Sequence, residues 1–160
     1  MEDFTTKTER TEAFWADFCQ ATGVEGDYDA VAFGDSVALA NELAALVLTG
    51  PKRATAGLLR DYEADGDPLP VLGGYVVMTD GHGEPKAVWQ TTDVRVGPLS
   101  SVDDKFAWDE GEGDRTRADW LRMHTNFFTR QAEAEGFAFH PDIETVFERF
   151  KIVWPPEHAD

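Results

Sequence analysis

The stretch of residues 49–55 limits the possible folds of this chain more than any other. The apolar residues before it recur at the spacing of a helix that buries one face: Leu39, Leu43, Leu46 and Val47. Gly50 predicts a left-handed end for this helix, and Pro51 prevents the helix from continuing. Residues 54–59 are small or apolar and predict a strand. A rigid helix-to-strand corner is therefore expected here.

Lys52 and Thr55 flank this corner, where the backbone can aim a cation and a hydroxyl group. A simpler interpretation stays open: Lys52 and Arg53 follow the helix and complement the negative end of its dipole. Spacing alone favours this simpler interpretation over a functional one.

The net charge of the chain is −17, because 14 Lys and Arg residues stand against 31 Asp and Glu residues. A surface this acidic repels long polyanions, which disfavours extended nucleic-acid binding. A small ligand, or a short nucleic-acid segment in a locally basic cleft, remains compatible with the charge. The basic residues are grouped in two places: Lys52, Arg53 and Arg60, then Arg115, Arg117 and Arg122.

A length of 160 residues is enough for one domain with a substantial core. No apolar run approaches the length of a bilayer span, and the polar residues 1–10 lack the apolar core of a signal peptide. Cys19 is the only cysteine, so neither a disulfide framework nor a thiolate metal cluster is expected. The sequence predicts a cytoplasmic protein that does not associate with membranes.

Helices at both flanks of a group of short strands predict an α+β fold. Helices are expected at about residues 7–22, 36–49 and 116–136, and strands at 54–59, 75–79, 87–96 and 145–154. Residues 25–32 are polar and are expected to form turns. Strands this short favour a small β-barrel, because closure removes exposed sheet edges.

The acidic segment 109–114 contains two glycines and precedes the third helix. Such a segment is usually only a solvated connector. The apolar face of the helix that follows carries Trp120, His124, Phe127 and Phe128. His124 is therefore expected on the inner side of the helix, packed by Trp120 and Phe128. It would have a structural hydrogen bond there or support a binding cleft.

Two motifs, in this order, make the sequence similar to the ASCH domain family. Gly50-Pro51-Lys52-Arg53-Ala54-Thr55 resembles the Gly-x-Lys-x-x-Thr signature of that family. The run Glu110-Gly111-Glu112-Gly113-Asp114-Arg115-Thr116, with Trp120, His124, Phe127 and Phe128 after it, resembles the second signature of the longer bacterial branch. Phe33-Gly34-Asp35-Ser36 and Glu148-Arg149-Phe150 also fit that branch.

The resemblance implies a single ASCH domain over residues 1–160, with its core at about 33–154 and an N-terminal helix at about 7–22. The implied fold is PUA-like, a small β-barrel flanked by helices with a cleft for RNA or a nucleoside. Short bacterial relatives are amidohydrolases that remove the acetyl group from N4-acetylcytidine with a lysine, a threonine and a glutamate. By resemblance these catalytic residues are Lys52, Thr55 and Glu112, with Glu110 as the alternative acid.

The chain departs from these amidohydrolases in two respects. It is substantially longer, and Arg53 follows the lysine where they commonly carry a hydroxyl residue. Both departures bear on the substrate.

Amide hydrolysis by these residues is also chemically reasonable in itself. A threonine hydroxyl is a poor nucleophile until a base takes its proton, and a partly desolvated Lys52 is the expected base. Glu112 would hold Lys52 in place or donate a proton to the departing amine. Backbone N–H groups of the corner would stabilise the oxyanion. This chemistry requires no metal, and no cofactor is expected.

Three functions remain open from the sequence. The first is hydrolysis of an acylated cytidine-type nucleoside, which the net charge favours. The second is a ribonuclease or RNA-processing enzyme that uses the same cleft, as described for a longer relative, with phosphates held by Arg53, Arg115, Arg117 and Arg122. The third is a non-catalytic RNA-binding module that stacks bases on Tyr62, Trp89 or Trp108.

The expected partner is a nucleoside or a short RNA segment in each case. The residues expected to bind it are Arg53, Tyr62, Glu110, Arg115 and His124.

Overall fold

The computed structural model describes residues 7–160, and these residues divide into two compact units. Unit 1 comprises Pro51–Val71 and Asp93–Arg149, and unit 2 comprises residues 7–50, Leu72–Thr92 and Phe150–Asp160. Residues 1–6 belong to the segment expected to lack a signal peptide, and they lie outside the described residues. The single domain expected over residues 1–160 stays a prediction.

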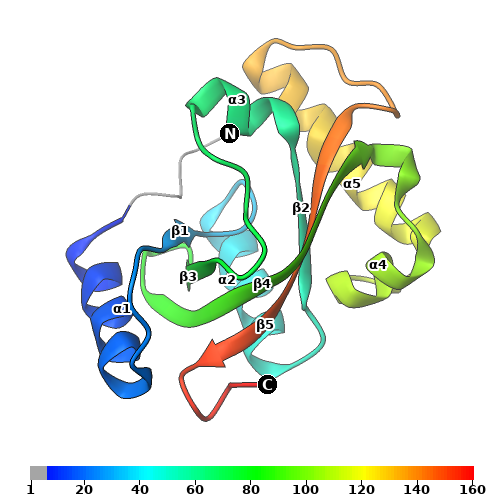
Figure 1. The fold of residues 1–160 in the computed structure, drawn as a ribbon. Coiled ribbons are helices and arrows are strands. Elements are labelled where there is room, and N and C mark those ends of the chain that lie inside the picture. The colour runs from blue at the N-terminus through cyan, green and yellow to red at the C-terminus, as the bar shows by residue number, and fades with distance from the viewer. Residues whose placement is uncertain (1–6) are drawn as a thin grey trace. The chain divides into compact units, whose positions relative to one another are not determined.

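The described residues form five α-helices and one mixed sheet (Figure 1). The helices are α1 Glu9–Thr22, α2 Val37–Thr49, α3 Leu59–Asp65, α4 Asp104–Glu110 and α5 Arg117–Glu135, with a 3-10 turn η1 at Leu99–Ser101. The strands are β1 Asp29–Val31, β2 Ala54–Leu58, β3 Tyr75–Thr79, β4 Pro85–Pro98 and β5 Glu144–Trp154. The strand order is β1-β3-β4-β5-β2. The predicted α+β class is confirmed.

The sequence indicates one of the strand pairings. β3 and β4 form the expected antiparallel hairpin, and β2 pairs antiparallel with β5. β1 pairs parallel with β3 in a region expected to form turns. With three residues and one buried side chain, β1 is too short to show a period-two pattern, so the sequence alone does not reveal it.

Unit 2 packs α1 against β3 and carries an aromatic core. α2 begins next to Ser36, whose side chain accepts a hydrogen bond from the Leu39 N–H and caps the helix. Trp89 is 1 % exposed and stacks on Phe150, with the ring centroids 4.0 Å apart. The expectation that Trp89 could stack an RNA base is therefore wrong, since its rings are inside the core.

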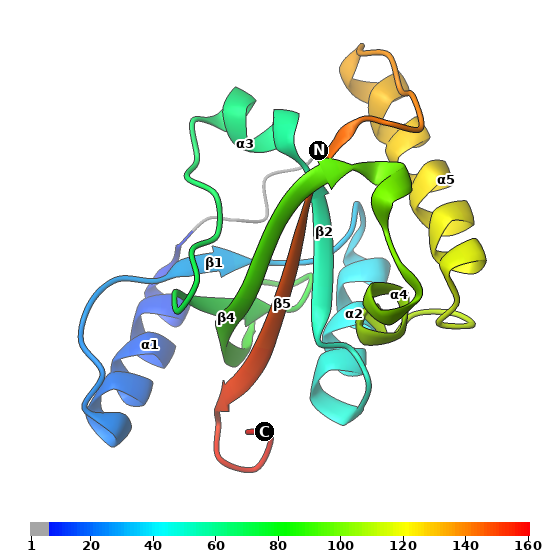
Figure 2. The same cartoon turned by 45° about the vertical axis from the view of Figure 1, so that its right-hand side comes forward.

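Unit 1 packs α3 and α4 against β2, and α4 also packs against α5 (Figure 2). Its core consists of residues from β2, α4, α5, β5 and η1, with two from loops: Ala54, Leu58, Leu99, Val102, Phe106, Ala107, Trp120, Phe128, Ile143 and Phe147. α5 begins after Thr116, whose hydroxyl accepts a hydrogen bond from the Asp119 N–H, and it ends before Gly136, close to the predicted bounds. This core holds the ends of β2 and α4 in place.

Two local expectations differ from the structure. Gly50 has φ −172°, so it is extended and not left-handed; Pro51 disfavours compact conformations for the residue before it. α3 was not expected, because its seven residues are mostly polar and none of them is buried. No helix within residues 7–160 combines the length and apolar composition needed to cross a membrane.

Candidate active site

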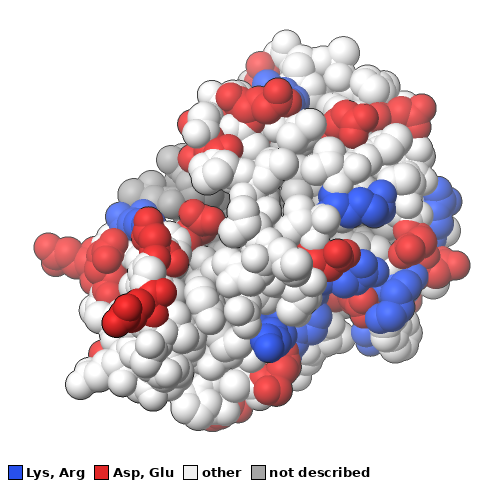
Figure 3. Space-filling model, in the orientation of Figure 1, with Lys and Arg blue, Asp and Glu red and all other residues white. Residues whose placement is uncertain are grey.

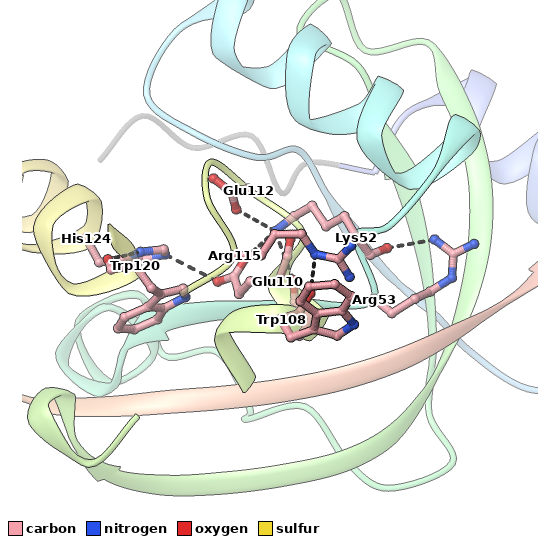
Figure 4. Close-up of polar contacts among 9 residues, drawn as sticks. Lys52, Arg53, Trp108, Glu110, Glu112, Arg115, Trp120 and His124 are labelled. Carbon is pink, nitrogen blue, oxygen red and sulfur yellow. Dashed lines mark hydrogen bonds and ion pairs between the residues drawn. The ribbon is translucent and has the colours of Figure 1, made fainter. Parts of the chain in front are cut away.

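Lys52 is a buried cation in unit 1, at the corner before β2. Its side chain is 1 % exposed. The ammonium group donates to the Ala54 carbonyl oxygen at 2.9 Å, to Glu112 Oε2 at 2.7 Å and to Glu110 Oε2 (Figure 4). These partners match the three donors of an ammonium group. A buried ammonium group costs several kcal/mol unless it is paired, so the two carboxyl groups are what permits Lys52 to lie here.

Two chain segments meet at Lys52, the corner and the end of α4. The Arg53 N–H donates to the Asp109 carbonyl oxygen at 2.7 Å. Gly111 ends α4 with φ 70°, and a Cβ atom at this position would lie 2.7 Å from the Lys52 backbone nitrogen. Only glycine fits here without displacing the backbone. The acidic segment is therefore a close-packed part of the site, and the view of it as a solvated connector is wrong.

The environment keeps Lys52 protonated. Burial by itself lowers the pKa of Lys52, but the charges of Glu110 and Glu112 outweigh burial and raise this pKa above its usual value. The C-terminal end of α4 adds a negative partial charge, since the Glu110 carbonyl oxygen lies 3.4 Å from the ammonium nitrogen. A base must first lose its proton, so this raised pKa argues against Lys52 as the base, and the catalytic role of Lys52 stays a prediction.

The two carboxyl groups beside Lys52 differ in proton affinity. Burial acts to raise the pKa of Glu110, but Lys52 and then His124 outweigh it and hold this pKa well below its usual value. Burial raises the pKa of Glu112, Lys52 lowers it, and Glu110 raises it further, to about 7. Potential ligand oxygens of the two carboxyl groups lie within 4.8 Å of each other, so a negative charge on one disfavours a negative charge on the other. Glu112, 17 % exposed, is therefore the carboxyl group of the pair whose pKa lies nearer to neutral pH.

His124 lies on the inner side of α5, as expected. Its ring stacks on Trp120 with centroids 3.8 Å apart, and Phe128 packs at 5.8 Å. Nδ1 lies 2.9 Å from the Trp120 carbonyl oxygen, and Nε2 lies 3.3 Å from Glu110 Oε1. The predicted phase of this helix is confirmed, and His124 contacts the carboxyl group that pairs with Lys52.

Trp108 and Arg115 close the segment that carries both carboxyl groups. The Arg115 guanidinium lies 3.6 Å from the centre of the Trp108 ring, and Arg115 Nε donates to the Trp108 carbonyl oxygen at 2.9 Å (Figure 4). Arg115 has φ 61°, a left-handed conformation that costs a residue with a side chain about 1 kcal/mol. Trp108 is 54 % exposed, so this contact lies at the surface.

A family model of the ASCH domain matches residues 29–154, which is most of the chain. The chain belongs to the ASCH domain family. The predicted family is thereby confirmed, and the match includes both predicted motifs.

Solved structures agree with this assignment. The ASCH domain from Lactobacillus crispatus JV V101 is 32 % identical over 95 % of this chain and 99 % of that chain, with a TM-score of 0.82. Protein EF3133 from Enterococcus faecalis V583 is also 32 % identical, over 91 % of this chain and 88 % of that chain, with a TM-score of 0.83. These likenesses confirm the PUA-like fold. No curated protein matches the sequence significantly.

The second catalytic candidate of this ASCH domain, Thr55, lies on β2. Strand alternation places its side chain on the face opposite Ala54 and Ala56, which contact the core of unit 1. The register pairs Thr55 with Glu148, which is buried. The structure thus brings Lys52, Glu110 and Glu112 together, and the role of Thr55 as nucleophile stays a prediction. Glu148 was not a predicted site residue; a carboxylate within the apolar run of β5 was the available signal.

The other predicted binding residues occupy different positions. Tyr62 lies on α3, next to Gly57 at the end of β2 that is farther from Lys52. The Arg53 guanidinium donates to the Lys52 carbonyl oxygen at 2.7 Å. Their roles in binding stay predictions.

Glu110, Glu112 and His124 have the donor types of a metal site, and their potential ligand atoms lie within 4.8 Å of one another. The Lys52 ammonium contacts both carboxyl groups of this set. A divalent cation would have to displace that ammonium, so the donor set fits the internal cation better than a metal ion.

Proposed function

We propose that this ASCH domain is a hydrolase for acylated cytidine-type nucleosides, similar to N4-acetylcytidine amidohydrolases, and that Glu112 transfers the protons. The observation that carries the proposal is the partly exposed Glu112 carboxyl group, with a pKa of about 7, beside the Lys52 ammonium at 2.7 Å. A group that titrates near the working pH is best suited to general acid–base catalysis. Lys52 supplies a fixed positive charge.

The reaction divides into balanced steps. The Thr55 hydroxyl oxygen attacks the acyl carbon while the Glu112 carboxylate takes its proton, and the positive charge of Lys52 stabilises the oxyanion. The bond to N4 breaks as Glu112 returns the proton to that nitrogen, which releases cytidine. Water then attacks the acyl-threonine while Glu112 takes a proton from it, and Glu112 gives this proton to the departing Thr55 oxygen, which releases the carboxylic acid and restores the enzyme.

The contacts of the basic residues support a small, uncharged substrate over RNA. Arg117 donates to the carbonyl oxygens of Val102 and Ser100 at 2.7 and 2.6 Å. Arg122 pairs with Asp119 on the same helix. Figure 3 shows that acidic side chains lie among the Lys and Arg side chains on the side that carries α4 and α5. A ribonuclease would need these cations for phosphates, and here they already have partners in the protein.

A substrate panel tests the proposal. The purified protein is incubated with a series of N4-acylated cytidines and with a structured RNA, at two salt concentrations, and products are separated by chromatography. We expect nucleoside hydrolysis that changes little with salt and an intact RNA. RNA cleavage that weakens steeply with salt, without nucleoside hydrolysis, would support the ribonuclease alternative and reject the proposal.

Variants separate the assigned roles. Glu112→Gln keeps the shape of the side chain but cannot exchange a proton, so turnover should fall by about 100-fold or more. The turnover of Thr55→Ala should fall by a similar factor if Thr55 is the nucleophile. Retained turnover in this variant would identify water as the nucleophile. Lys105→Met, at an exposed position on α4, is the matched control and should keep full activity.

A further inference from the structure

His124 joins the carboxyl pair to the backbone of α5. Nδ1 faces the Trp120 carbonyl oxygen, which can only accept, so Nδ1 carries a proton and donates it there. Nε2 faces Glu110 Oε1 at 3.3 Å, so a second proton on Nε2 makes the ring an imidazolium that pairs with this carboxylate. Stacking on Trp120 fixes the plane of the ring. The geometry therefore aims one ring nitrogen at one carboxyl group of the pair.

The charged groups around this contact come from three segments. Glu110 at the end of α4 faces the imidazole directly, Glu112 follows in the loop, and Lys52 lies at the corner before β2. Glu110 contacts both Lys52 and His124, whereas Glu112 has an ion pair with Lys52 alone among the ion pairs of residues 7–160. This asymmetry stabilises the negative charge on Glu110 more than on Glu112.

We propose that His124, with both ring nitrogens protonated, is a positioning residue that keeps Glu110 ionised beside Lys52 and so leaves the exchangeable proton of the pair on Glu112. The inference rests on the proposed function for its catalytic meaning. The distribution of the proton is, however, a property of the free protein. Without the His124 contact, the proton affinities of the two carboxyl groups differ less, so the groups share the proton more evenly. Glu112 is then a poorer proton-transfer group.

Two substitutions divide the contacts of His124. In His124→Asn the amide nitrogen is placed near the position of Nδ1, so the contact with the Trp120 carbonyl oxygen is kept and the contact with Glu110 is lost. In His124→Gln the amide nitrogen reaches toward the position of Nε2, so a neutral donor to Glu110 is kept. His140→Gln changes an exposed histidine of unit 1 and is the matched control.

Carbon-13 NMR titration of glutamate side chains measures the proton distribution without substrate. In the wild type, we expect one carboxyl group to titrate near pH 7, and Glu112→Gln should remove this signal. In His124→Asn, the titration should appear on both carboxyl groups, and its midpoint should rise by about one pH unit because a favourable partner of the negative charge is lost. The midpoint should shift less in His124→Gln, and it should stay at the wild-type value in His140→Gln.

Several outcomes would overturn the proposal. One is a folded His124→Asn protein in which Glu112 alone titrates at the wild-type midpoint. Another is a His124→Gln protein that shifts as far as His124→Asn, because the donor to Glu110 would then be irrelevant. If His124→Asn does not fold, an unchanged titration in His124→Gln overturns it instead. Absence of nucleoside hydrolysis by the wild type would reject the proposed function, but not the titration result.

Discussion

Removing the buried ammonium group should destabilise the protein strongly. Lys52→Met keeps the length of the side chain but leaves Glu110 and Glu112 without their common cation. Removing one partner of a buried ion pair costs about 3–5 kcal/mol, because the remaining charge is buried without compensation. For a protein of this size, such a loss in the free energy of unfolding lowers Tm by about 6–20 °C.

The size of this effect should depend on pH, and the sign follows from the two carboxyl groups. In the wild type the pKa of Glu110 is lowered, so its contribution to stability is present above its unfolded-state pKa and is lost in acid. The pKa of Glu112 is raised to about 7, so its contribution is lost as the pH rises toward 7. Without Lys52, burial raises both pKa values, and the variant loses stability with rising pH.

The difference in the free energy of unfolding between the wild type and Lys52→Met should therefore grow from pH 5 to pH 8. Urea unfolding at pH 5, 6, 7 and 8 measures it, and Lys105→Met is the control. Lys105 is 72 % exposed and pairs with Asp109 on the surface, so its loss should cost less than about 1 kcal/mol at every pH. A difference below about 1 kcal/mol for Lys52→Met at pH 8, or one that does not change with pH, would refute this account of the site.

Three further substitutions test neighbouring parts of the site. Glu112→Gln should raise the free energy of unfolding by about 1–3 kcal/mol at pH 8, where the wild type carries a second buried charge, and by little at pH 5. Equal effects at both pH values, in urea unfolding, would contradict the raised pKa of Glu112. Gly111→Ala should cost about 2–4 kcal/mol, because its Cβ atom meets the Lys52 backbone at 2.7 Å in a left-handed position. Gly136 has φ 78° and nothing within 4 Å of an added Cβ atom, so Gly136→Ala is the control and should cost only about 1 kcal/mol for the backbone conformation. Equal losses of stability in the two variants, measured by thermal melts, would contradict the close approach of Gly111 to the Lys52 backbone. Arg115→Gly suits the left-handed backbone but uncovers the Trp108 ring, so stability should change by less than about 1 kcal/mol while acrylamide quenching of tryptophan fluorescence increases. Unchanged quenching would show that Arg115 does not cover Trp108 in solution.

The longer elements of this fold could be predicted from the sequence because each has a local cause. α5 has its Thr116 cap, an apolar face and Gly136 at its end, and β3 and β4 alternate around a turn. β1 and α3 could not be predicted in this way. β1 exists through its pairing with β3, and α3 has no buried residue to give it a periodic pattern.

The composition of the site could be predicted better than its electrostatics. The two motifs indicated Lys52, Glu110 and Glu112, although 58 residues separate Lys52 from Glu110. The number of carboxyl groups around the ammonium could not be counted from the motifs, although that number affects the pKa of Lys52. Both Glu110 and Glu112 raise the pKa of Lys52, which is why the proposed proton-transfer role is assigned to Glu112 and not to the lysine.

The pairing of one ammonium with two carboxyl groups also limits how related sequences can diverge. A lineage that loses Lys52 retains two buried acids without a cation, and one that loses both acids retains a buried cation without an anion. Each single substitution lowers the stability of the fold, so these positions should be replaced together, by apolar residues of similar volume. Chains that preserve the fold but have abandoned its chemistry should therefore show coordinated replacement at all three positions, and a chain with only one of the motifs intact should be rare.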